Sequence, residues 1–239
     1  MQPNYHADNL AVWNKVVDFL QDERFMAAYR RGMDSGHHIG RPPGSHDDLH
    51  IEWRVYTAVW AAQHALRLDG DFVECGVNTG IMSLAICQYL EFARVPKRFY
   101  LFDTYNGLPE EQVSPEEEVL GRLDAGRVVF SECYEIARSN FAPYPNAILV
   151  RGKVPDTLPG AGIGRVAYLS IDMNLIEPEI AALEFFWDKL APGAPVLLDD
   201  YGWAEHRVQK DAMDEFARAK GVPVLNMPTG QGLILKPPR

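Results

Sequence analysis

Acidic side chains follow the short apolar runs of this sequence, and carboxylates are residue types that can hold a cation. Glu74, Asp103, Asp172 and the pair Asp199-Asp200 each come directly after such a run. Apolar runs of this kind are typical of strands that are buried on both faces of a parallel sheet. Ligands of open α/β sheets bind at the carboxyl ends of the strands. We therefore expect these acids to face one functional site.

Asp172, Asp199 and Asp200 form a candidate site for a divalent metal ion. If the strands before them are neighbours, their carboxylates come from strands about 4.8 Å apart. Carboxylates this close repel one another and raise each other's pKa unless a cation lies among them. An all-oxygen donor set without His or Cys favours Mg²⁺ or a similar hard ion. The alternative is that one or two of these acids cap helices, which explains one strand-end acid better than three.

Residues 70–80 predict a buried strand, a tight turn and a helix, and the turn is a candidate cofactor loop. Gly76 and Gly80 permit a sharp turn and leave room for a ligand beside the main chain. A dinucleotide loop reads G-x-G-x-x-G because its helix N-terminus receives a pyrophosphate, but Glu74 stands where the first glycine would be. A carboxylate repels a pyrophosphate and suits an ammonium and a sulfonium, which favours S-adenosylmethionine. A purely structural turn is the alternative.

Asp103 is predicted to lie at the carboxyl edge of the sheet, beside this loop. Acids in a similar position hold a ribose hydroxyl in dinucleotide folds. The alternative is a surface aspartate that caps the turn before Asn106-Gly107. The expected cofactor-binding residues are Glu74, Gly76, Val77, Asn78, Gly80, Asp103 and Thr104.

The elements that would position these residues alternate between strands and helices. Five apolar runs separated by helical segments predict an α/β fold with a doubly wound, mostly parallel sheet. Residues 222–225 and 233–236 predict a closing hairpin that adds an antiparallel strand and completes seven strands. The acidic stretch 107–130 is expected to be a solvated insertion with a loop and a helix.

Helices are predicted at 9–34 and 47–68, before the sheet, with an irregular Pro- and Gly-containing linker at 37–45. The second helix has an apolar stripe at helical spacing that is expected to pack on the sheet, formed by Leu49, Trp53, Tyr56, Trp60 and His64. The alternative is a helical cap whose aromatic residues also line a substrate pocket. We expect residues 1–68 to form an N-terminal helical extension and residues 69–239 to form the cofactor-binding domain.

The composition is that of a soluble globular protein. Hydrophobic residues make up 47% and charged residues 23% of the 239 residues, which is ordinary for such proteins. The formal net charge of −10 argues against nucleic-acid binding and against docking on anionic lipid. We find no apolar run near the roughly 20 residues that span a bilayer, no signal-peptide pattern at the start and no cysteine framework. The expected location is the cytoplasm.

Four short motifs stand out in the second part of the sequence: residues 72–77 (FVECGV), 102–109 (FDTYNGLP), 154–159 (VPDTLP) and 198–202 (LDDYG). They resemble the motifs of the macrocin O-methyltransferase family, which includes enzymes that methylate sugar hydroxyls on macrolide and aminocoumarin antibiotics. The resemblance covers about residues 70–235, and four motifs in the same order make it specific.

This resemblance implies a class I S-adenosylmethionine-dependent fold with a Mg²⁺ site. By position, the metal ligands would be Asp172, Asp199 and Asp200. The cofactor contacts of the family would include Glu74, Gly76 and Asp103.

The chain departs from the family where a general base is expected. The fourth strand of the family ends in D-x-D-x-Y, and its second acid is a candidate base. Here the second acid is Asn174, which cannot accept a proton, and Ile176 replaces the aromatic residue. His206 is a candidate base because histidine titrates near neutral pH; the alternative is a surface histidine in the first turn of a helix. A metal ion that acidifies the hydroxyl would make a strong base unnecessary, so Asp172 and His206 are the candidate catalytic residues.

These observations predict a metal-assisted O-methyltransferase that acts on a hydroxylated small molecule, such as a sugar or natural-product scaffold. The alternatives are an NAD-dependent oxidoreductase, which Glu74 and the missing third glycine disfavour, and a non-catalytic cofactor-binding protein, which Asn174 keeps open. A homo-oligomer is expected because the N-terminal helices carry more aromatic surface than one sheet face needs. This surface is formed by Trp13, Trp53, Tyr56 and Trp60.

Overall fold

The computed structural model describes residues 2–39, 41–42 and 44–238. Gly40 and Pro43 of the predicted linker lie outside the described residues. The centre of the fold is a seven-stranded sheet. Its strands are β3 (Asp71–Cys75), β4 (Phe99–Asp103), β5 (Ala147–Arg151), β6 (Val166–Ile171), β7 (Pro195–Leu198), β8 (Leu225–Asn226) and β9 (Gly232–Leu235).

The strand order is β5-β4-β3-β6-β7-β9-β8. The first five strands in this order, β5, β4, β3, β6 and β7, are parallel to one another. The strand β9 is antiparallel to both β7 and β8. The predicted doubly wound sheet with an antiparallel closing hairpin is therefore confirmed. Because β3, β6 and β7 are adjacent in the sheet, the carboxyl ends of these strands, with Glu74, Asp172 and Asp199, lie side by side.

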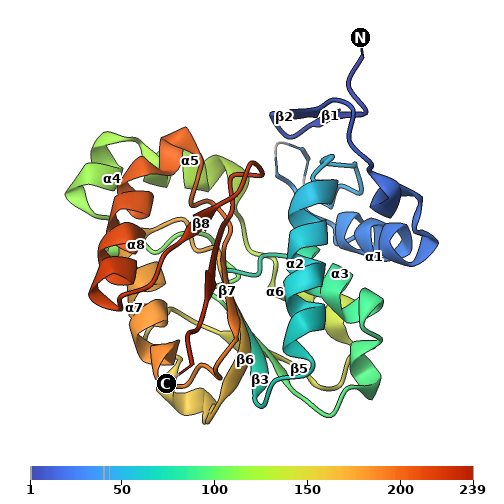
Figure 1. Cartoon of the computed structure of the whole chain (residues 1–239). Helices are drawn as coiled ribbons and strands as arrows, with labels where there is room; N and C mark the ends of the chain where they lie inside the picture. The colour runs from blue at the N-terminus through green and yellow to red at the C-terminus, as the bar shows by residue number, and fades with distance from the viewer. Residues whose placement is uncertain (1, 40, 43, 239) are drawn as a thin grey trace.

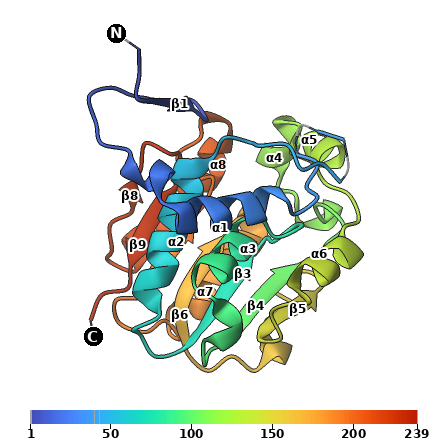
Figure 2. The same cartoon turned by 90° about the vertical axis from the view of Figure 1, so that its right-hand side faces the viewer.

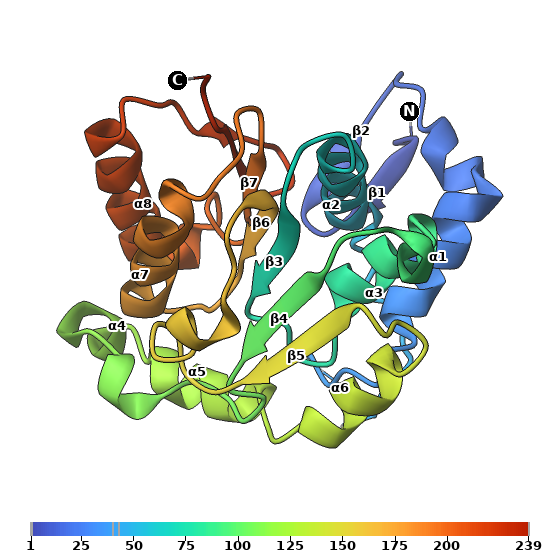
Figure 3. The same cartoon turned by 90° about the horizontal axis from the view of Figure 1, so that it is seen from below.

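Helices cover both faces of the sheet. Their bounds are α1 (Glu23–Met33), α2 (Glu52–Ala65), α3 (Ile81–Tyr89), α4 (Pro115–Val119), α5 (Arg122–Val129), α6 (Tyr134–Phe141), α7 (Ile176–Trp187) and α8 (Arg207–Ala219). One face carries α7 and α8, and the other carries α2, α3 and α6, with α1 packed on α3 (Figures 2 and 3). Successive residues of β3 point into different cores, Phe72 towards α2 and α3, Val73 towards α7. This two-sided burial explains the continuous apolar runs of the sequence.

The predicted helix at 9–34 is wrong in its first half. The chain there forms a hairpin of β1 (Tyr5–Ala7) and β2 (Leu10–Val12), and a short 3-10 turn, Asp18–Gln21, precedes α1. Asp8 and Asn9 form the two-residue turn of this hairpin with φ angles of 50° and 56°, values that Asp and Asn tolerate better than most residues. The side chain of Asp22 then accepts hydrogen bonds from two backbone N–H groups and caps α1.

The predicted helix at 47–68 is present but shorter, and its apolar stripe does not pack on the sheet as expected. The helix α2 lies between the sheet and the segment before α1, so it buries two faces. Trp53 and Tyr56 pack against Phe19 from that segment, whereas Trp60 is 47% exposed. The fully buried small residues of α2 are Ala58, Ala61, Ala62 and Ala65.

The β1–β2 hairpin and the insertion with α4 and α5 lie at the same end of the sheet, where the parallel strands end (Figure 1). The insertion is less solvated than predicted, because Glu117 of α4 is fully buried and accepts a hydrogen bond from the backbone of Ile176 at 2.8 Å. Within the described residues, no helix combines the length and the apolar character needed to cross a membrane.

Candidate active site

A cavity of about 530 Å³ opens at the carboxyl ends of the parallel strands, where doubly wound sheets bind ligands. Its size is within the ~300–1,000 Å³ range of small-molecule sites. The loops after β3, β4, β6 and β7 line it, together with the N-terminal segment and the 107–130 insertion. The sequence-predicted residues on its wall are Glu74, Gly76, Val77, Asn78, Asp103, Thr104, Asp172, Asp199, Asp200 and His206.

Gly80 is the predicted cofactor residue that does not belong to this cavity wall. It precedes α3 with φ of 103°, and a Cβ there would lie 2.7 Å from the Phe141 ring. Gly76, with φ of 90°, has no room for a Cβ because the backbone carbonyl of Asp172 occupies that space. The packing of the protein therefore already requires both glycines, whatever space a ligand needs.

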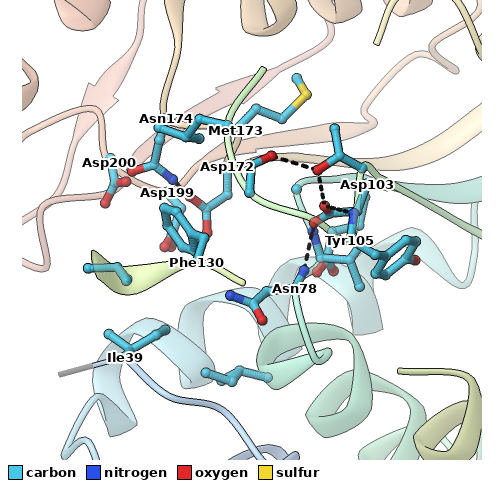
Figure 4. A pocket seen from close by; sticks show the side chains of 18 of the residues that line it. Ile39, Asn78, Asp103, Tyr105, Phe130, Asp172, Met173, Asn174, Asp199 and Asp200 are labelled. Atoms are coloured by element: carbon cyan, nitrogen blue, oxygen red, sulfur yellow. Dashed lines mark hydrogen bonds between the residues drawn. The ribbon is translucent and has the colours of Figure 1, made fainter. Parts of the chain in front are cut away.

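Asp103 fixes the conformation of the loop that follows β3. One carboxylate oxygen accepts hydrogen bonds from the backbone N–H groups of Val77 at 2.6 Å and Asn78 at 2.7 Å. The other accepts from the backbone N–H of Tyr105 at 2.6 Å (Figure 4). Hydrogen bonds to a charged group contribute about 1.5–3 kcal/mol each, so Asp103 holds the two loops together. A ribose contact from Asp103 remains a prediction.

Glu74 carries an unpaired carboxylate oxygen at the cavity. Its Oε1 accepts a hydrogen bond from the Ser83 hydroxyl at 3.2 Å, whereas Oε2 is buried and has no partner among the described residues. Burial raises the pKa of Glu74 well above its usual value. A buried carboxylate without a partner is costly, and a cationic ligand in the cavity would relieve that cost.

Asp172, Asp199 and Asp200 lie together as the sequence predicted. Each offers a carboxylate oxygen within 4.8 Å of those of the other two, and Figure 4 shows the three side chains grouped on one side of the cavity. Burial, with the charges of Asp199 and Asp200, raises the pKa of Asp172. The pKa of Asp200 is also raised, chiefly by burial. The cluster therefore has the donor set that a hard divalent cation requires.

Sequence reasoning missed Arg54, which reaches this cluster from α2. Its Nη2 donates to Asp199 Oδ2 and lies 3.3 Å from Asp200 Oδ1. Burial alone would lower the pKa of Arg54, but the neighbouring carboxylates Asp199 and Asp200 raise it. Gln231 Nε2 donates to the other oxygen of Asp199 at 2.8 Å.

A signal for Arg54 was present in the sequence. It is the only Lys or Arg residue of α2, a helix otherwise rich in alanine and aromatic residues. Buried Arg is rare without a partner, so a lone arginine in such a helix indicates that it has an acidic partner, but it does not indicate which acid. Asp8 was also missed; it lines the cavity from the turn of the β1–β2 hairpin, which sequence reasoning had placed beside a helix.

His206 lies buried on the cavity wall, and its hydrogen bonds define its tautomer. Its Nε2 is 3.2 Å from Arg122 Nη1, and because a guanidinium only donates, Nε2 is the acceptor. Its Nδ1 therefore carries the proton and donates to Gln209 Oε1 at 2.7 Å. Nε2 also lies 3.7 Å from Asp200 Oδ2. The nitrogen that can take a proton thus faces the aspartate cluster.

Asn174 occupies the position of the missing family acid. Its Nδ2 donates to Asp172 Oδ1 at 3.1 Å, and its backbone N–H donates to Glu179 at 2.9 Å. The side chain therefore holds a metal-ligand candidate in place and does not offer a base.

The sheet order and the acidic cavity at its carboxyl edge define the class of the protein: it has the fold of the class I methyltransferases. The structure of the O-methyltransferase NovP matches it with a TM-score of 0.70 and 20% sequence identity, covering 87% of this chain and 88% of that one. The fold class predicted from the sequence is confirmed.

The family follows from the sequence comparison. Residues 57–227 match the macrocin-O-methyltransferase (TylF) family, and the chain belongs to that family. The predicted resemblance is therefore confirmed.

Two curated proteins from Streptomyces are similar to this chain. One is the 8-demethyl-8-(2,3-dimethoxy-alpha-L-rhamnosyl)-tetracenomycin-C 4'-O-methyltransferase of Streptomyces olivaceus, 33% identical over 142 residues, or 56% of this chain. The other is the demethyldecarbamoylnovobiocin O-methyltransferase of Streptomyces niveus, 30% identical over 162 residues, or 64% of this chain. The matches span 54% and 60% of those proteins, a little over half of their length.

Proposed function

We propose that the protein transfers a methyl group from S-adenosylmethionine to a hydroxyl of a small molecule, a sugar or another natural-product scaffold. The observation that carries this proposal is one cavity with two acidic regions, an unpaired Glu74 oxygen beside the β3 loop and the three-aspartate cluster. Family membership and the names of the two Streptomyces relatives support the same reaction.

The cofactor is proposed to lie on the β3 loop, with its ammonium or sulfonium towards Glu74. The unpaired Glu74 Oε2 and the unpaired Asn78 Oδ1 give the polar contacts that such a ligand needs. They also disfavour the alternative of an NAD-dependent oxidoreductase, because a carboxylate oxygen repels a pyrophosphate. Asp103 is proposed to contact the ribose with the acceptor capacity that its backbone partners leave free.

The acceptor hydroxyl is proposed to lie between the cofactor methyl group and the aspartate cluster. A Mg²⁺ ion held by Asp172, Asp199 and Asp200 would act as a Lewis acid on the hydroxyl oxygen. His206 would take the proton at Nε2, which requires Arg122 to release its hydrogen bond to that nitrogen. Holding the acceptor and cofactor in line supplies a large part of the rate, because methyl transfer is a displacement.

The remaining wall of the cavity fits an apolar scaffold. Its apolar residues come from the N-terminal segment, the insertion and the loop after β6; they are Ile39, Leu49, Ile51, Leu108, Phe130 and Met173. We propose that residues 1–68, as an extension of the 69–239 domain, provide one side of the acceptor site.

The reaction is tested by incubating the protein with S-adenosylmethionine that carries a labelled methyl group, Mg²⁺ and a panel of hydroxylated glycosides and aglycones. Label transferred to an acceptor oxygen supports the proposal. Calorimetry with S-adenosylhomocysteine and with NAD separates methyl transfer from the oxidoreductase alternative. Cofactor binding without transfer to any acceptor favours a non-catalytic protein.

Glu74→Gln is expected to weaken S-adenosylhomocysteine binding at least about tenfold, the loss expected for a hydrogen bond to a charged group. Because the pKa of Glu74 is raised, its carboxyl group in the ligand-free protein stays protonated to a higher pH than usual. A cationic ligand binds the ionised carboxylate. Wild-type affinity should therefore increase with pH, and binding should release a proton. Calorimetry in buffers of different ionisation enthalpy measures both effects.

In this experiment, Glu91→Gln is the matched control because Glu91 is exposed and pairs with Arg94 outside the cavity. Glu74→Gln should not lower the melting temperature, because an amide is cheaper to bury than a carboxylate. Equal affinity of the two variants, with equal proton release, would remove Glu74 from the cofactor site.

A cytoplasmic homo-oligomer is also proposed. Of the aromatic residues that suggested it, Trp53 and Tyr56 are packed inside the fold, whereas Trp13 and Trp60 are 48% and 47% exposed. These two indoles support an interface. We expect light scattering at micromolar concentration to give a mass above that of one chain, and a monomer mass would contradict this.

A further inference from the structure

The Arg54 guanidinium stands where a cation shared by Asp199 and Asp200 would lie. Its Nη2 is hydrogen-bonded to Asp199 Oδ2 and is 3.3 Å from Asp200 Oδ1. A Mg²⁺ or Mn²⁺ ion would approach the same oxygens to about 2.1 Å. The guanidinium nitrogen and a metal ion cannot both occupy the space between these two carboxylates, because each would have to contact the same oxygens.

The charge of the cluster also argues against Arg54 as the final occupant. Metal binding requires all three carboxylates to be ionised, and together with one guanidinium they carry two negative charges (−3 + 1 = −2) on oxygens that lie within 4.8 Å of one another. A divalent cation in place of Arg54 would leave only one negative charge (−3 + 2 = −1). Asp199 would keep its orientation without Arg54, because Gln231 donates to its other oxygen at 2.8 Å.

Asp8 offers the displaced guanidinium a new partner. It lines the same cavity, and among the described residues it makes no hydrogen bond or ion pair. Burial raises the pKa of Asp8, whereas the charge of Arg54 acts to lower it. The Arg54 Nε is buried and has no partner among the described residues either, so the present position leaves one of its donors unsatisfied.

We propose that Arg54 is a built-in competitor of the divalent cation, which holds Asp199 and Asp200 in the metal-free protein and moves to Asp8 when the cation binds. This inference rests on the proposed metal site. It makes Arg54 a positioning residue that links metal loading to the β1–β2 hairpin, because Asp8 lies in the turn of that hairpin.

The test measures Mn²⁺ affinity by electron paramagnetic resonance for the wild type, Arg54→Gln and Arg122→Gln. Arg122 is the matched control, because its charge also acts on Asp200 but its guanidinium donates to His206 Nε2 and to the backbone carbonyl of Glu205 instead of the aspartates. If Arg54 competes with the metal ion, Arg54→Gln should bind Mn²⁺ at least about tenfold more tightly than the wild type, a factor that is typical when two binding events influence each other. Arg122→Gln should change the affinity less than about threefold, as a screened neighbouring charge does.

The role of Asp8 is tested by a double-mutant cycle. Asp8→Asn should weaken Mn²⁺ binding when Arg54 is present and should have a much smaller effect in the Arg54→Gln background. An equal effect in both backgrounds would show that Asp8 acts only as a distant charge and would overturn its assignment.

Other outcomes also decide the proposal. Unchanged or weaker Mn²⁺ binding by Arg54→Gln would overturn the competition. Mn²⁺ binding by Arg54→Gln but not by the wild type would support it in its strongest form. Absence of Mn²⁺ binding in every variant would overturn it together with the metal site, whereas S-adenosylhomocysteine binding, measured separately, would still test the methyl-transfer proposal.

Discussion

Asp199→Asn is expected to lower kcat/KM for methyl transfer by about 10²–10³-fold, the effect of losing one electrostatic group at a reacting centre. Asp199 is 4% exposed and lies at the centre of the cluster, with hydrogen bonds to Arg54 and Gln231. An asparagine keeps the shape of the side chain but loses the charge that a hard cation needs. Mg²⁺ affinity and turnover should fall together.

Folding is expected to survive this substitution. Asp200 continues to pair with Arg54, and the loss of one carboxylate relieves repulsion within the cluster. If Asp199 only capped a helix, its loss would cost about 1 kcal/mol of stability and leave metal dependence unchanged. A thermal melt and a Mg²⁺ titration of turnover distinguish these two roles.

The matched control is Asp211→Asn, which removes an exposed carboxylate that pairs with Arg207 on α8. It should leave turnover and Mg²⁺ dependence at wild-type values. Full turnover of chelator-treated wild type on its true acceptor, or equal turnover of the two variants, would contradict the proposed metal mechanism.

The sequence predicted the sheet and the acids at its edge because those signals are local. An apolar run followed by an acid indicates the carboxyl end of a buried parallel strand. Four of the five apolar runs end in this way, and five runs separated by helices leave few topologies. The adjacency of Asp172 and Asp199 then depends only on strand order, which the structure confirms.

The N-terminal segment was harder to predict because its strands are three residues long and its apolar residues also fit helical spacing. The signal that favoured a hairpin was the Asp8-Asn9 pair, a two-residue turn that the helical interpretation passed over. In α2 the periodicity was real, but two faces are buried, and the alanines are fully buried whereas Trp60 is 47% exposed.

Long-range partners of charged residues are the part of the site that sequence patterns do not contain. Arg54 meets Asp199 across 145 positions of the chain, and nothing in the spacing of either residue indicates the other. Gly76 illustrates the same limit: a glycine in a candidate cofactor loop is crowded by the backbone of Asp172 on the neighbouring strand.

His206→Gln is expected to lower kcat by about 10²-fold or more, the contribution of a positioned general base. The reason is the geometry of Nε2, which carries no proton and faces Asp200 at 3.7 Å on the cavity wall. A glutamine keeps polarity at this position but cannot take a proton. The KM for the cofactor should change little, because His206 lies on the aspartate side of the cavity.

His64→Gln is the matched control, since His64 stacks on Trp60 at the surface of α2 and does not line the cavity. A second variant, Asn174→Asp in the His206→Gln background, restores an acid where the family carries one. It should recover part of kcat if proton removal limits the reaction, although the new carboxylate loses the amide hydrogen bond to Asp172 and adds repulsion there. If His206→Gln keeps the wild-type kcat, and Asn174→Asp adds nothing, the proton leaves without a base from this chain and the role of His206 is limited to its contacts with Arg122 and Gln209.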